Sequence, residues 1–230
     1  WDVHGADTLR LFVAGQAPEF FESADGSIFM NGIGTDIWNN ADECRFVYKT
    51  LSGDGSMTVR VDYLDATPDV WVKAGVMVRQ STEAGAANTF VAMTGSGGGG
   101  ATFQQRPEAD VASTSQHTYA GNPFAPPYWV RLGRAGDTFT AQISPDGENW
   151  QAAGDPVTVT MSDPVLIGLA LTSHDASEVT SAAFSNVTTT GNVGGSWQVA
   201  EVGAAQPEAG NDPEPLYVAV EDGNGRVAVV

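Results

Sequence analysis

Apolar and polar residues alternate over short segments along most of the chain. Every second residue from Met57 to Tyr63 is apolar and the residues between them are polar, and the segment from Phe139 to Ile143 repeats the pattern. A period of two gives an extended strand one apolar face. Glycine and proline separate these segments, and we find no stretch with the period of an amphipathic helix. The pattern predicts an all-β protein, a sandwich or jelly roll.

Turn sequences divide the alternating segments. The stretch SPDGENW, centred on Asp146 and Gly147, predicts a hairpin between strands 137–144 and 149–153. The stretch SGDGS at 52–56 predicts a second turn of the same kind.

Two further segments are predicted loops. TGSGGGGA at 94–101 is rich in glycine, but no βαβ unit surrounds it, so it is not a dinucleotide site. The segment 107–127 is long and irregular. Loops of this length in a compact domain are often binding loops, although a surface excursion explains the length equally well.

Alternation also indicates a candidate binding face. Val72, Val76 and Leu169 belong to apolar faces that pack between two sheets. The opposite faces offer an aromatic surface beside planar hydrogen-bonding groups, which suits a sugar. The candidate ligand-binding residues on them are Trp71, Arg79, Gln104, Arg106 and His174. The alternative is that Arg79, Arg106 and His174 are buried polar groups that satisfy one another and nearby carboxylates.

Both ends of the chain are strand-like. DTLRLFVAG begins at Asp7, and EPLYVAVEDGNGRVAVV forms the last segment of the sequence. We expect 8–14 to pair with 215–221, with 226–230 folding back, as a small satellite sheet. A sheet of this size should dock on the jelly roll or accept a strand from another chain.

Four stretches together carry a resemblance to a known family. They are DIWNNADECRFVYKTLSGDGSMTVRV, WVKAGVMVRQS, PYWVRLGRAGDTFTAQISPDGENW and IGLALTSHDASEVTSAAFSNV. They resemble the concanavalin A-like lectin/glucanase superfamily, and within it the LamG-like jelly-roll modules of large secreted bacterial proteins. The resemblance implies a two-sheet jelly roll whose concave sheet often receives carbohydrate. The same fold serves enzymes, lectins and spacers, so it implies no single function.

The two terminal segments resemble strands of a galactose-binding-like β-sandwich. This resemblance implies that the jelly roll is inserted into a second β module. We therefore expect a terminal strand segment at 1–25, the jelly roll at 26–191, and a linker with returning strands at 192–230.

Composition restricts the partners and the location. The formal net charge is −18 and the sequence pI is about 4.2. Nucleic acid and anionic membranes would be repelled, and no apolar run approaches the ~18 residues that span a bilayer. We expect no nucleic-acid partner and no membrane insertion. The family resemblance implies an extracellular or cell-surface location. The sequence starts at Trp1 and shows no signal peptide, so we expect this chain to be a piece of a longer protein.

Cofactor motifs are missing from the sequence. Cys44 is the single cysteine, so no intramolecular disulfide forms, and we expect it to be a packed small residue. His4, His117 and His174 lack the spacing of a zinc site. We expect no cofactor. A structural calcium ion is the alternative, because turn carboxylates offer oxygen ligands: Asp54, Asp65 and Asp69.

Catalytic motifs are missing as well. Retaining glycosidases of this superfamily carry two carboxylates at alternate positions of one strand, as in ExDxE, and no such motif occurs. The GxSxG motif is also absent. The first hypothesis is therefore a non-catalytic, extracellular carbohydrate-binding or adhesion module with a polysaccharide or glycan partner. The second is a structural spacer whose terminal strands pair with a neighbouring domain or subunit, and the third is a glycoside-active enzyme.

Overall fold

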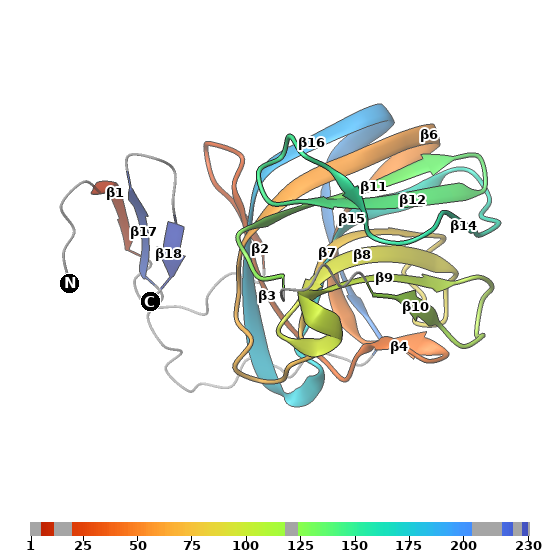
Figure 1. Cartoon of the computed structure of the whole chain (residues 1–230), viewed down its shortest axis with the longest axis horizontal. Coiled ribbons are helices and arrows are strands. Elements are labelled where there is room, and N and C mark those ends of the chain that lie inside the picture. The colour runs from red at the N-terminus through yellow and green to blue at the C-terminus, as the bar shows by residue number, and fades with distance from the viewer. Residues whose placement is uncertain (1–5, 12–19, 118–123, 204–217, 223–226, 230) are drawn as a thin grey trace. The chain divides into compact units, whose positions relative to one another are not determined.

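The computed structural model describes residues 6–11, 20–117, 124–203, 218–222 and 227–229 (Figure 1). The chain divides into two compact units. One joins the two ends, residues 1–19 and 207–230, and the other comprises residues 20–206. In the described residues, no helix is long and apolar enough to cross a membrane.

The larger unit is a jelly-roll sandwich of antiparallel strands, as the alternation predicts. Its first sheet contains, in spatial order, β10 (Thr114–Gln116), β9 (Ala101–Arg106), β8 (Asn88–Thr94), β7 (Lys73–Arg79), β15 (Val165–Thr172), the first half of β6 (Cys44–Leu64) and the end of β16 (Asp175–Val202). Its second sheet contains β2 (Phe20–Glu22), β3 (Ile28–Gly34), the first part of β16, the second half of β6, β11 (Tyr128–Ala135), β12 (Thr138–Ser144), β13 (Gln151–Ala152) and β14 (Val157–Thr158). A short hairpin of β4 (Ile37–Trp38) and β5 (Ala41–Asp42) and a 3-10 turn, η1 (Gly97–Gly100), complete it.

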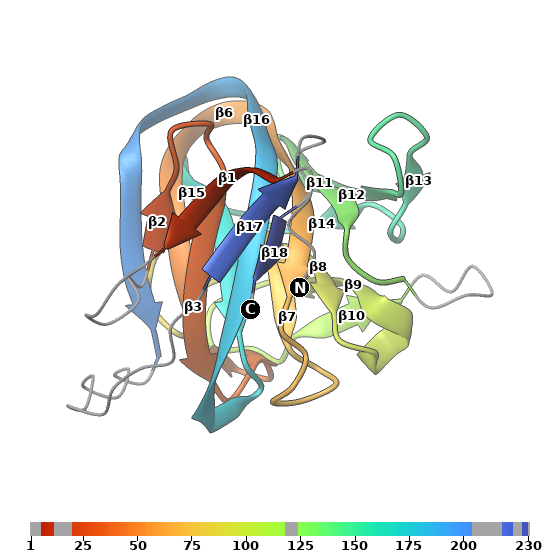
Figure 2. The ribbon, with the colours of Figure 1, turned by 90° about the vertical axis from the view of Figure 1, so that its left-hand side faces the viewer.

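Strands β6 and β16 run through both sheets, and Figure 2 shows them arching together from one layer to the other. The turn predicted at 52–56 is therefore wrong, because β6 bends there and continues. Gly53 has a φ of 72°, and Gly191 of β16, which pairs with Gly55, has a φ of 79°. The bend is held from both sides, since the Gly53 amide donates to Asp163 and the Gly136 amide donates to Asp54.

The core lies between the two sheets and confirms the predicted faces. Val72, Val76 and Leu169 are fully buried in it. The predicted hairpin after β12 is also confirmed, with Ile143 opposite Gln151. Cys44 is buried and free, as expected of a packed small residue.

The terminal unit is a three-stranded sheet of β1 (Ala6–Leu11), β17 (Val218–Asp222) and β18 (Val227–Val229). Leu9 lies opposite Val220, and Ala219 lies opposite Val229, so the pairing predicted for the satellite sheet is confirmed over the described residues. The boundaries differ from the predicted ones. Residues 192–202, assigned to a linker from sequence, are the second half of β16, because they pair with β6 in the first sheet. Most of the predicted linker lies outside the described residues.

Candidate functional site

Strand pairing arranges the side chains of the first sheet in rows across its outer face, away from the core. One such row runs across five strands: Tyr48, Gly168, Met77, Phe90 and Gln104. Paired residues of neighbouring strands project from the same side of a sheet. The row therefore places candidate residue Gln104 on the face opposite to Val76 and Leu169.

The middle of this outer face is covered by the β4–β5 hairpin. Ile37 packs there in a second apolar cluster with Phe46, Met77 and Phe90, and each of these side chains is at most 2% exposed. Tyr48 is half-buried at the edge of the cluster and stacks on Phe46, with 5.1 Å between ring centroids. The chain itself thus fills the region that an open groove would occupy.

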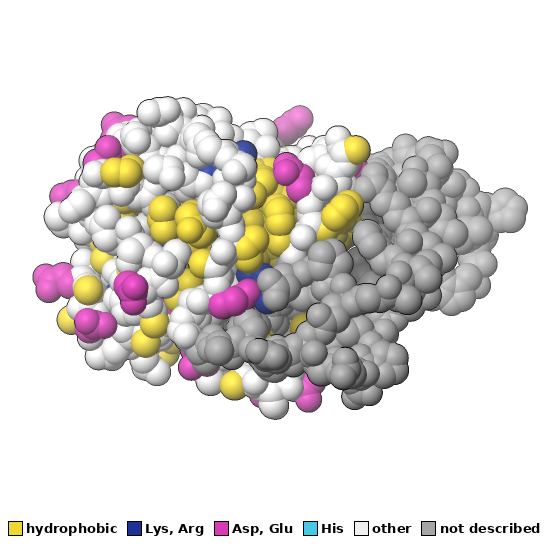
Figure 3. Space-filling model, turned by 180° about the vertical axis from the view of Figure 1, so that it is seen from behind, with side chains coloured by type: hydrophobic (Ala, Val, Ile, Leu, Met, Phe, Trp, Pro, Cys, Tyr) yellow, Lys and Arg dark blue, Asp and Glu magenta, His cyan; other side chains and the backbone are white. Residues whose placement is uncertain are grey.

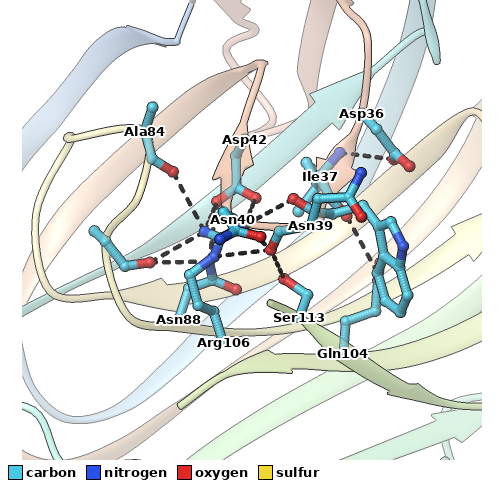
Figure 4. A network of polar contacts seen from close by, with 12 residues as sticks. Asp36, Ile37, Asn39, Asn40, Asp42, Ala84, Asn88, Gln104, Arg106 and Ser113 are labelled. Atoms are coloured by element: carbon cyan, nitrogen blue, oxygen red, sulfur yellow. Dashed lines mark hydrogen bonds and ion pairs between the residues drawn. The ribbon is translucent and has the colours of Figure 1, made fainter. Parts of the chain in front are cut away.

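Asp42 anchors this hairpin to the sheet, as Figure 4 shows. Its Oδ1 accepts from Arg106 Nη2 at 2.5 Å, and its Oδ2 accepts from Arg106 Nη1 at 2.7 Å. Asn88 donates to the same Oδ2 at 2.9 Å, and Arg79 Nη1 lies 3.3 Å from it. Asp42, Arg79 and Arg106 are all fully buried. A bidentate carboxylate–guanidinium pair of this kind is strong and directional.

The remaining guanidinium donors bind loop carbonyls. Arg79 donates to the carbonyls of Ser81 and Glu83, each at 2.6 Å. Arg106 donates to the carbonyls of Trp38 and Ala86 at 3.0 and 3.2 Å. The two arginines therefore hold the hairpin and the 81–86 loop onto β7 and β9. Neither guanidinium is accessible to a ligand in this arrangement, which corresponds to the alternative of a buried polar network.

Gln104 lies at the border of this network. Its Nε2 donates to the Ile37 carbonyl at 3.1 Å, and the residue is 3% exposed. The side chain holds the start of the β4–β5 hairpin against β9. The Oε1 atom is buried and has no hydrogen-bond partner.

Trp71 lies beside the other end of the outer face, in the turn that leads into β7. The Trp71 amide donates to Asp69 Oδ1 at 2.7 Å, and the amides of Ser96 and Gly97 donate to the Val70 carbonyl. A Cβ on Gly97 would lie 2.3 Å from the indole Cδ2, so only glycine lets the ring rest on η1. The glycine-rich segment thus forms a close-fitting support for a half-buried tryptophan.

A series of charged side chains in contact with one another lies next to Trp71. Lys73 is 3% exposed and forms an ion pair with Asp36, and its Nζ lies 5.9 Å from the centroids of both the Trp38 and Trp71 rings. Burial lowers the pKa of Lys73 below its ordinary value, and the adjacent Asp36 carboxylate opposes this effect. The ammonium is therefore tied to a carboxylate between two indoles.

His174 extends this series of contacts toward the surface. Its Nε2 lies 3.3 Å from Asp36 Oδ2 and its Nδ1 lies 3.2 Å from Asp69 Oδ1. Its backbone has a φ of 61°, an uncommon conformation for a residue with a side chain. The His117 ring is exposed and also lies beside the indole, with its centroid 5.6 Å from that of Trp71. We call this group the Trp71 site; its members are Asp36, Trp38, Asp69, Trp71, Lys73, His117 and His174.

All five residues of the predicted set lie on or beside the outer face, but the structure separates them. Arg79, Gln104 and Arg106 belong to the network under the hairpin. Trp71 and His174 belong to the Trp71 site. Sequence reasoning did not assign Asp36 or Asp42 to either group, because no local pattern indicates which distant cation a single carboxylate meets.

Each carboxylate considered as a calcium ligand accepts from a backbone amide, in an Asx-type turn for Asp65 and Asp69 and across to the β11–β12 turn for Asp54. Asp65 Oδ1 accepts from the Thr67 amide, Asp69 Oδ1 from the Trp71 amide, and Asp54 Oδ1 from the Gly136 amide. In the part of the chain that the structure describes, no three His, Cys, Asp or Glu side chains are grouped as metal ligands.

A separate hollow of about 950 Å³ lies between the loops at 80–87, 107–110 and 158–160. Its walls are small residues and hydroxyls, with the carboxylates of Glu83, Glu108 and Asp110. None of its described lining residues is aromatic. It therefore lacks the flat apolar surface on which a sugar ring packs, and the Trp71 site is the better candidate.

Comparison with known proteins supports the fold and leaves the activity open. No protein-family model and no curated protein sequence matches the chain. A functionally unknown protein from Saccharomyces cerevisiae is 17% identical, with a TM-score of 0.58 over 84% of this chain and 100% of that one. An alginate lyase from Corynebacterium sp. is 11% identical, with a TM-score of 0.47 over 77% of this chain and 82% of the lyase. The GH43 protein BlXynB from Bacillus licheniformis is 12% identical, with a TM-score of 0.42 over 69% of this chain and 32% of that protein. The similarity to the Saccharomyces cerevisiae protein, which has a TM-score above 0.5, bears on the fold alone, and identities this low say nothing about catalysis.

Proposed function

We propose that the jelly roll is a non-catalytic carbohydrate-binding module and that the Trp71 site is where the sugar docks. The observation that carries this proposal is a half-buried indole held on a glycine support, with polar side chains beside it. Sugar rings bind where an aromatic face meets convergent hydrogen-bonding groups. His117 and Asp69 supply such groups next to Trp71.

The arrangement of the carboxylates favours binding over hydrolysis. A retaining glycosidase needs two carboxyl groups about 5 Å apart with the scissile bond between them. At the Trp71 site, the His174 ring contacts Asp36 through one nitrogen and Asp69 through the other. An imidazole therefore occupies the position between the two carboxylates where a substrate would have to enter.

The test is a binding titration of the whole chain against a panel of oligosaccharides by calorimetry. We expect Trp71→Ala to weaken binding at least about 30-fold, since loss of a central aromatic anchor costs about 2 kcal/mol or more. Trp150→Ala is the matched control. Trp150 is also half-buried, but it packs under Arg131 of the second sheet, with 3.8 Å between its ring centroid and the Arg131 Cζ. Equal losses in both variants, or no binding of any sugar by the natural chain, would refute the proposal.

A second candidate function, a spacer or assembly module, is favoured by the terminal sheet. Strands β1 and β17 pair with each other although the whole jelly roll lies between them in sequence. That topology is expected if a LamG-like module is inserted into a second, galactose-binding-like β module of a large secreted or cell-surface protein. Such a protein would present the jelly roll outward and use the terminal strands for contacts with neighbouring domains.

A further inference from the structure

The charges on the outer face limit which sugars the Trp71 site would accept; this argument rests on the function proposed above. Among the described residues, the lysine and arginine side chains on that face are Lys73, Arg79 and Arg106. Arg79 and Arg106 are fully buried against Asp42. Lys73 is 3% exposed and is paired with Asp36. No cation among the described residues of this face is therefore available to bind a carboxylate on a ligand.

The exposed charges of the site are instead negative. The Asp36 side chain is 20% exposed and the Asp69 side chain 36% exposed. The rest of the molecule adds to this field, because its formal net charge is −18. Figure 3 shows acidic side chains spread over one face of the jelly roll, with basic ones confined to small areas. An anionic sugar would meet like charges both over long range and at the indole.

We propose that the Trp71 site selects neutral glycan chains and rejects chains of uronic acids. A neutral ring still gains contact with the Trp71 indole and hydrogen bonds to His117 and Asp69. A uronate ring of the same shape makes the same apolar contact, but its carboxylate finds no free cation and lies near Asp36 and Asp69. Selectivity then comes from this repulsion and not from additional attraction to the neutral sugar.

The test uses pairs of oligosaccharides that share a backbone and differ only in oxidation of C6: glucan and glucuronan, galactan and galacturonan, mannan and mannuronan. We expect at least one neutral chain to bind and its acidic counterpart to bind at least about tenfold more weakly at low salt. The difference should narrow in high salt, because ions screen the repulsion.

Two variants separate a local effect from the effect of net charge. Asp69→Asn keeps a hydrogen-bond acceptor for the Trp71 amide and removes one negative charge at the site. Glu148→Gln removes the same charge from an exposed position in the turn between β12 and β13 of the second sheet. We expect only Asp69→Asn to reduce the neutral-to-acidic preference, by about threefold or more. Equal or tighter binding of an acidic chain would overturn this inference and leave carbohydrate binding standing, whereas failure of all six chains to bind would overturn both.

Discussion

Replacing Asp42 with asparagine should destabilise the jelly roll more than any other single change of one carboxylate. Asp42 is the only acidic side chain that contacts Arg79 or Arg106 among the ion pairs of the described residues, and all three groups are fully buried. Asp42→Asn preserves the shape, but it leaves two guanidinium groups without a counter-charge and turns an amide NH₂ toward one of them. Removing one partner of a buried ion pair costs about 3–5 kcal/mol.

The assay is thermal unfolding of the whole chain by calorimetry. For a unit of this size 1 kcal/mol corresponds to roughly 2–4 °C, so the melting temperature should fall by about 6–20 °C. Asp163→Asn is the control, because Asp163 pairs with Arg134 at 3.1 Å but its side chain is 51% exposed. Its loss should cost less than about 1 kcal/mol. If the two variants melt within about 2 °C of each other, the network does not hold the hairpin as described.

Three further predictions concern other parts of the chain. Burial raises the pKa of the Cys44 thiol from 9.0 to about 12, so a thiol reagent should modify Cys44 only after unfolding. The neutral thiol contributes fully to the free energy of unfolding below pH 9.0, and this contribution should be lost as the pH rises toward 12. Cys44→Ala should not show this loss. Gly75→Ala should cost about 1–3 kcal/mol in chemical denaturation, because its Cβ would lie 2.0 Å from the Val91 carbonyl oxygen, whereas Gly194→Ala, with nothing within 4 Å, should be nearly neutral. Deleting 212–230 removes the partner of β1 and should leave the jelly roll folded while promoting aggregation; a monomer in size-exclusion chromatography with residues 8–14 protected in hydrogen exchange would contradict this.

The alternation of residues was sufficient to predict the sheets and their faces. It places Val76 in the core and Gln104 on the opposite side without knowledge of any long-range contact. The reason is that side chains alternate between the two faces of a strand, so a strand with one buried face has an apolar residue at every second position. The turn at 146–147 was predictable for a similar reason, because Asp-Gly chemistry acts within a few residues.

Local signals failed where the outcome depends on distant partners. SGDGS at 52–56 has the composition of a hairpin turn, yet its neighbours on β11, β15 and β16 keep β6 running through the bend. The packing of the β4–β5 hairpin on the outer face of the first sheet could not be predicted from local sequence either. Asp42 follows a polar loop-like stretch, and the arginines that it binds lie 37 and 64 residues further along the chain. To predict the buried network, one would have to know that Arg79 and Arg106 share the Asp42 carboxylate.

The central proposal for this protein is that a sugar binds at the Trp71 site. The most direct measurement is an NMR titration of the whole chain with the oligosaccharide that binds best, following the indole N–H signals of its tryptophans. We predict that the Trp71 and Trp38 signals shift with a common affinity while those of Trp129 and Trp150, which belong to the second sheet, stay in place. Saturable shifts at Trp129 or Trp150, with Trp71 unchanged, would contradict the account.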